Sequence, residues 1–194
     1  MKMREDRRTK YTENVIHQTF LELLKSKPLS KISVKDLCAS ADVNRGTFYH
    51  HYEDIYDLFE KLEIGYAEEI ITHMQDPHSV FDFQFEGFLV KTLRFFRERP
   101  DISLVILNPA SKGKGMQMII QQEKEHWVSA WRSIGSVTEQ ESEWLLTFLS
   151  NGFISCFTAW YQSGFAWDEK QLAKTLTQLV AGGLNAFKQP EGGA

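Results

Sequence analysis

The sequence predicts an all-α protein with a three-helix N-terminal domain and a larger helical C-terminal domain. Apolar residues recur at helical spacing along most of the 194 residues, and strand-like alternation is nearly absent. Prolines, glycines and small polar residues interrupt this pattern and separate the predicted helices. Charge is uneven, because residues 1–52 hold 10 of the 22 basic residues and 6 of the 26 acidic ones. We therefore expect a basic N-terminal part on an acidic body, as in many nucleic-acid-binding proteins.

The first predicted helix covers residues 11–25. Its apolar stripe consists of Val15, Ile16, Phe20, Leu23 and Leu24. Pro28 ends this helix, and Ser33 with Asp36 three residues later forms a capping box for a short second helix that ends near Ala41.

The third predicted helix covers residues 44–52 and follows a tight connection, with Asn44 as its N-cap. Phe48 and Tyr52 are four residues apart and can face the core together. The outward side then carries Arg45, Thr47, Tyr49, His50 and His51. Such a helix can enter the DNA major groove while the second helix packs across it. A solvated helix face would use the same residue types, and composition alone does not choose between these two interpretations.

The stretch from Ile32 to Tyr52, ISVKDLCASADVNRGTFYHHY, resembles the helix-turn-helix of the TetR family of transcriptional regulators. The resemblance covers about residues 10–65 and implies a helix-turn-helix DNA-binding domain at 1–53 and a ligand-binding and dimerisation domain at 54–194. It implies that Ser33 and Lys35 approach the DNA backbone. It also implies DNA-contacting positions at Arg45, Gly46, Thr47, Tyr49 and His51, and the predicted DNA-binding set is these residues with Asn44 and His50.

The resemblance further implies the function. We expect a repressor that binds a near-palindromic, double-stranded operator as a homodimer, needs no cofactor and can be released by a small apolar or aromatic effector. This sequence departs from the family pattern at three positions, with Asp42 where glycine is usual and Glu53 and Ile55 where lysines are common. Aspartate tolerates a left-handed turn, but an acidic residue near phosphate weakens DNA binding. A protein-binding adaptor or coactivator on the same fold is therefore the alternative.

Six further helices are predicted, at about residues 54–74, 81–97, 101–107, 116–134, 138–163 and 168–188. The Gly-Lys-Gly sequence in the loop at 108–115 lacks the spacing of a phosphate-binding loop. The last two helices are apolar on more than one stripe, which predicts burial against a second subunit. Small residues that would permit close helix approach there are Gly152, Ser155, Gly182 and Gly183.

The aromatic residues concentrate in the C-terminal part, which contains all 5 tryptophans and all but two of the 14 phenylalanines. They can form an ordinary core or line an apolar effector cavity. The predicted lining residues are Phe95, Trp127, Trp131, Phe153 and Trp160, with His126 or Asn151 as polar groups.

Other classes of protein find little support in the sequence. There is no long apolar run, and no apolar segment follows the charged first ten residues, so neither a membrane span nor a secretion signal is expected. Cys38 and Cys156 lack metal-ligand spacing and are expected to be buried thiols of a cytoplasmic protein. No catalytic or metal-binding motif is recognisable, so we do not expect an enzyme.

Overall fold

The computed structural model describes residues 2–74, 85–134 and 137–185, and no strand occurs within these ranges. The N-terminal helices are α1 (Lys2–Ser26), α2 (Val34–Ala41) and α3 (Arg45–His51), with a 3-10 turn at Leu29–Lys31. They are followed by α4 (Ile55–Met74), α5 (Phe85–Glu98), α6 (Pro100–Ile106), α7 (Lys114–Ile134), α8 (Glu139–Gln162) and α9 (Glu169–Asn185). The predicted all-α class is confirmed.

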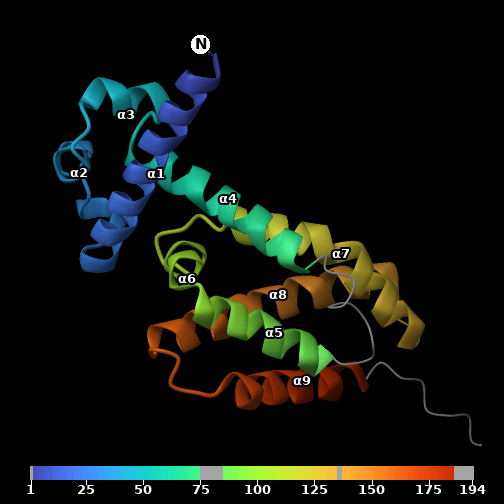
Figure 1. Cartoon of the computed structure of the whole chain (residues 1–194). Helices are drawn as coiled ribbons and strands as arrows, with labels where there is room; N and C mark the ends of the chain where they lie inside the picture. The colour runs from blue at the N-terminus through green and yellow to red at the C-terminus, as the bar shows by residue number, and fades with distance from the viewer. Residues whose placement is uncertain (1, 75–84, 135–136, 186–194) are drawn as a thin grey trace, which may run out of the picture.

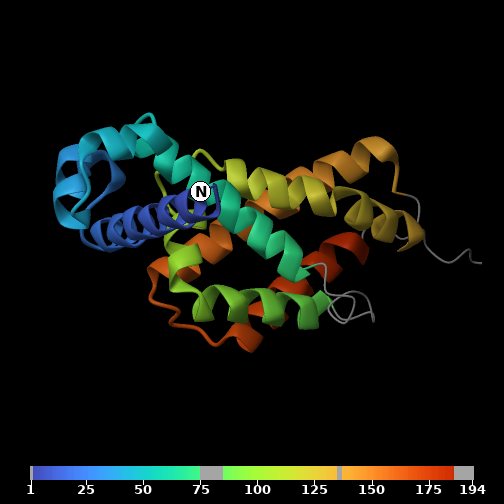
Figure 2. The same ribbon diagram turned by 45° about the horizontal axis from the view of Figure 1, so that its top comes forward.

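The helices form two groups (Figure 1). Helices α1, α2 and α3 lie together at one end of the molecule, which we call the head, and α5 to α9 form the body. Helix α4 leaves the head and runs into the body in both views (Figures 1 and 2). Within the body, α5 packs along α9, and α7 packs against both α4 and α8.

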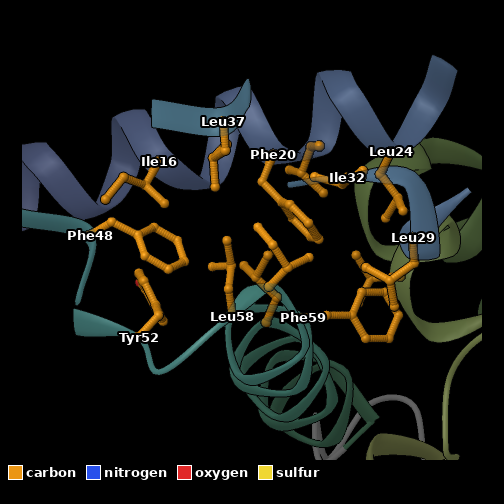
Figure 3. Packing of buried hydrophobic residues seen from close by; sticks show 14 of the residues in the cluster. Ile16, Phe20, Leu24, Leu29, Ile32, Leu37, Phe48, Tyr52, Leu58 and Phe59 are labelled. Carbon is orange, nitrogen blue, oxygen red and sulfur yellow. The ribbon is translucent and has the colours of Figure 1, made fainter. Parts of the chain in front are cut away.

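The head has its own apolar core. Figure 3 shows Ile16 and Phe20 of α1 beside Leu37 and Phe48, which come from α2 and α3, with Leu58 of α4 below them. All five side chains are fully buried. The apolar stripe predicted for the first helix therefore meets the buried side of the helix-turn-helix.

Two helices contribute to both cores. Helix α4 places Leu58 in the head cluster and Ile70 in the body cluster. Helix α6 places Val105 in the head cluster, whereas Ile102 and Ile106 belong to the body cluster. The position of the head is therefore set by packing against α4 and α6.

Several helix ends differ from the prediction. Helix α1 begins at Lys2 instead of residue 11, because residues 2–10 are mostly good helix formers without an apolar period. Residues 81–84 and 186–188, where the ends of two predicted helices fall, lie outside the described residues. Cys38 is buried as expected, whereas Cys156 is only half-buried.

Candidate nucleic-acid interface

The helix-turn-helix is held by N-caps at Ser33 and Asn44, as predicted, but the Asp36 carboxylate accepts from Lys27 Nζ at 3.4 Å instead of completing the predicted capping box. Ser33 Oγ accepts a hydrogen bond from the Asp36 backbone N–H at 3.1 Å and starts α2. Asn44 Oδ1 accepts from the Thr47 backbone N–H at 2.7 Å and from the Thr47 hydroxyl at 3.0 Å, which starts α3. These bonds satisfy donors that a helix N-terminus otherwise leaves unpaired.

The turn between α2 and α3 uses Asp42 in the left-handed conformation, with φ 52° and ψ 43°. The Asp42 and Val43 backbone N–H groups both donate to the carbonyl of Cys38, which closes α2. Aspartate therefore takes the place of the glycine usual in this turn, at a cost of about 1 kcal/mol.

One side of α3 is buried and the other is exposed. Phe48 is fully buried and Tyr52, which follows the helix, is 5% exposed. On the opposite side Arg45 and His50 are exposed, and Tyr49 is 57% exposed. Arg45 and Tyr49 are four residues apart, so the guanidinium and the aromatic ring share the exposed side of α3. This surface has the groups needed for hydrogen bonds to bases and phosphates.

Other members of the predicted set lie around this surface. Ser33 and Lys35 are exposed at the start of α2, while Thr47 is half-buried. Gly46 is exposed, and a Cβ there would lie 3.2 Å from Asn44 Oδ1. A side chain at this position would therefore press on the N-cap of α3.

His51 does not lie on the outward side, and this part of the prediction is wrong. Its side chain is only 9% exposed, and Nδ1 lies 3.1 Å from Glu13 Oε1 of α1. The imidazole therefore ties the end of α3 to α1, because a carboxylate 38 positions earlier in the chain reaches it.

Two further residues that sequence reasoning missed, His17 and Lys61, also fix α3. His17 Nε2 lies 2.8 Å from the Tyr52 hydroxyl, and Lys61 Nζ donates to the His51 carbonyl at 3.0 Å. Burial lowers the pKa of His17, and the nearby negative charge of Glu13 acts in the opposite direction. Burial raises the pKa of the Tyr52 hydroxyl to about 12. The only sequence signal for His17 is its place beside the apolar stripe of α1.

The start of α4 is acidic. Asp54 Oδ1 accepts from the backbone N–H groups of Tyr56 and Asp57 at 2.7 and 2.8 Å, and Asp57 Oδ2 accepts from Glu53 N–H at 2.9 Å. The Asp54 carboxylate therefore occupies two backbone donors of the first turn of α4. A phosphate is therefore disfavoured there.

The predicted effector residues do not all converge. Trp127 and Phe153 are 6.1 Å apart between ring centroids, and with Phe88 and Phe157 they line an apolar cavity of about 100 Å³. Phe95 instead stacks on His73 at 4.5 Å.

The ring of Trp160 lies under the Arg97 guanidinium, with 5.1 Å between Arg97 Cζ and the ring centroid. Trp160 Nε1 donates to the Trp167 carbonyl at 2.8 Å. The side chains of His126 and Trp131 lie outside the described residues. Asn151 lines an open groove of about 1300 Å³ alongside the cavity.

Helices α8 and α9 leave apolar groups in solvent. Trp144 and Phe148 of α8 are 67% and 75% exposed, and Leu179 of α9 is 69% exposed. At Gly152 and Gly182, a Cβ would meet no atom of the chain within 4 Å. The packing of one chain therefore does not require glycine at these positions.

The described ranges carry few signs of other functions. None of their helices combines the length and hydropathy that a membrane span requires. No group of three or more His, Cys, Asp or Glu residues in the described part is placed to hold a metal ion.

Comparison with known proteins adds two family matches. The family described as "Bacterial regulatory proteins, tetR family" matches residues 18–62, and "Transcriptional regulator C-terminal region" matches residues 84–182. No curated protein matches the chain.

Solved structures show the same fold. A TetR transcriptional regulator from Streptococcus agalactiae 2603V is 24% identical, with a TM-score of 0.67 over 97% of this chain and 100% of that one. A candidate tetR family regulator from Shewanella sp. PV-4 is 18% identical, with a TM-score of 0.69 over 92% and 99%. The fatty acid degradation regulator FadR from Bacillus halodurans is 14% identical, with a TM-score of 0.65 over 88% and 98%.

Proposed function

This chain belongs to the TetR family of bacterial regulatory proteins, and from that membership we propose that it is a repressor that binds a near-palindromic operator as a homodimer. It is a DNA-binding transcriptional regulator. We place its DNA-binding domain at residues 1–53 and its effector-binding and dimerisation domain at residues 54–194. Because α4 packs into both cores, it connects the two functions.

The observation that carries the DNA-reading role is the exposure of Tyr49 beside Arg45 on a helix whose other side holds the fully buried Phe48. In the proposed complex, Arg45 makes a bidentate contact with guanine and Tyr49 donates its hydroxyl to phosphate. The Thr47 hydroxyl is held by Asn44, which leaves its methyl group for contact with a thymine methyl.

The surrounding residues have supporting roles. Ser33 and Lys35 lie at the exposed start of α2 and approach the sugar-phosphate backbone, and His50 lies at the edge of the reading surface. His51 acts from behind this surface, because its contact with Glu13 sets the orientation of α3.

The dimer forms through α8 and α9 in this proposal. Trp144, Phe148 and Leu179 supply exposed apolar surface, and Gly152 and Gly182 allow close approach of partner helices. Two heads held by one dimer can reach half-sites roughly 34–36 Å apart, one turn of DNA.

The effector site is the cavity between Trp127 and Phe153 together with the open groove beside it. None of the residues that line the cavity is charged, which favours an apolar or aromatic group. Because a cavity of about 150 Å³ can hold benzene, a space of about 100 Å³ accepts a smaller group, and the rest of the ligand lies in the groove. Release from DNA then requires that the effector bind the two head arrangements with different affinity.

Selection of bound sequences from a random duplex library tests the proposal. We expect enrichment of a near-palindrome, and its affinity should fall as salt rises because phosphate contacts release counterions. A folded dimer that enriches no sequence, with or without candidate effectors, would contradict the operator-binding role.

The acidic start of α4 supports one alternative, a protein-binding adaptor or coactivator. Glu53 and Asp54 are exposed beside the end of α3, where they oppose phosphate and favour a basic protein surface. Failure to enrich DNA, combined with binding of a basic protein partner that is lost in Glu53→Lys, would support the adaptor.

A further inference from the structure

Glu63 is a buried acidic residue in the middle of α4. It is 1% exposed. Its Oε1 accepts hydrogen bonds from the Ser111 hydroxyl at 2.7 Å and from the Gly115 backbone N–H at 3.0 Å. Ser111 Oγ in turn accepts from the Gly113 backbone N–H at 2.8 Å. One buried acceptor therefore joins α4 to the α6–α7 loop and to the first turn of α7, whose dipole favours an acidic side chain there.

Gly115 permits this close contact. A Cβ at this position would lie 2.8 Å from Glu63 Cγ, 2.9 Å from the Glu63 carbonyl oxygen and 3.1 Å from Ile106 Cδ1. The first two distances are too short for any side chain, and the carbonyl is backbone that cannot rotate away. Any residue larger than glycine would therefore push the start of α7 away from α4.

A second contact lies about one turn before Glu63 in α4, where Glu60 forms an ion pair with Lys114 of α7. We call Glu60, Glu63, Ser111, Lys114 and Gly115 the α4 clamp. Glu60, Ser111 and Lys114 of this clamp also line the open groove. The loop that holds α4 is therefore part of the wall of the proposed effector site.

The clamp lies between the two parts of α4 that pack into different cores. Phe59 and Leu62 belong to the head cluster, and Ala67 and Ile70 belong to the body cluster. A shift of α7 relative to α4 would therefore act at the point where the head core ends and the body core begins.

We propose that the α4 clamp fixes the orientation of the head on the body, and that Glu63 is a positioning residue for operator binding. The inference rests on the proposed operator-binding function. Two heads that are already held at the required separation lose less freedom when they bind two half-sites.

The test compares Gly115→Ala with Gly65→Ala, a matched change in α4 where a Cβ would meet nothing within 4 Å. Glu63→Ala removes the shared acceptor, while Glu63→Gln retains an oxygen that can accept both bonds. We expect Gly115→Ala and Glu63→Ala to weaken operator binding about tenfold, within the range common for coupled sites. Gly65→Ala and Glu63→Gln should retain the wild-type affinity.

Affinity is measured on variants shown to be folded and dimeric by circular dichroism and sedimentation. A merely structural role would lower the melting temperature and leave the affinity of the folded dimer unchanged, and that result would overturn the inference. If Glu63→Ala does not fold, the operator affinities of Gly115→Ala and Gly65→Ala are compared, and equal affinities would overturn the inference.

Failure of the proposed function gives a different result, because wild-type protein would then select no operator. Hydrogen exchange tests the clamp in that case. We expect Gly115→Ala, compared with Gly65→Ala, to speed exchange of α4 amides from Ile55 to Leu62. Faster exchange confined to residues 111–118 would overturn the inference.

Discussion

Removal of the Phe148 ring should weaken the proposed homodimer while leaving the fold of each chain nearly unchanged. The side chain is 75% exposed in the single chain, so most of its surface remains to be buried by a partner. Full burial of a phenylalanine contributes about 1.5–3 kcal/mol, so each copy supplies about 1–2 kcal/mol at the interface. A twofold dimer buries two copies, which gives about 2–4 kcal/mol. Phe148→Ala should therefore raise the dimer Kd roughly 30- to 700-fold.

Sedimentation velocity over a range of protein concentrations measures this Kd directly. Tyr11→Ala is the control, because Tyr11 is 70% exposed but lies on α1 in the head. Its dimer Kd should equal that of the wild type. If Phe148→Ala also dimerises like the wild type, the exposed face of α8 is not the interface, and the proposed separation of the two heads has no basis.

Three further predictions concern the head. Arg45→Ala should cost about 1–3 kcal/mol of operator affinity and relax preference at one base pair per half-site, whereas Tyr49→Phe should weaken binding to all sequences. Competition with operator variants separates these effects, and unchanged affinity in both would refute the reading surface. Phe48→Ala should destabilise the head by about 3–5 kcal/mol in urea unfolding, because its ring is fully buried, and a loss below about 1 kcal/mol would contradict that packing. Stability should fall as pH drops below 6.5, because burial lowers the pKa of His17 and the unfolded chain takes up a proton that the folded head does not. His17→Gln should flatten the pH dependence of the unfolding free energy in this range, and an unchanged slope would assign it to other groups.

Local signals predicted the helix-turn-helix well. Both caps, at Ser33 and Asn44, involve a backbone N–H only three positions ahead, so the residue types and their spacing were sufficient. The left-handed turn at Asp42 also depends on nearby residues alone, because its backbone N–H bonds the carbonyl of Cys38 four positions back. The burial of Phe48 followed from helical spacing, since residues four apart share a face.

Contacts between helices were harder to predict. His51 was expected on the outward side, because its helix position alone cannot reveal that Glu13 of α1 is within reach. Phe95 and Phe153 were both predicted to line the effector cavity, yet only Phe153 lines it, and Phe95 stacks on His73. Nothing in the sequence distinguished Glu63 from the exposed acidic residues around it.

The sequence by itself determined the all-α class, the order of the helices, the capped helix-turn-helix and the family. These features depend on hydrogen bonds and side-chain spacing within about one helical turn, where the chain geometry is known in advance. Only the tertiary structure decided that His51 turns toward α1 and that Glu63 joins α4 to α7. The partners in these contacts are 38 and 52 positions apart in the chain, and they meet only because the packing of the two cores fixes the distance between their helices.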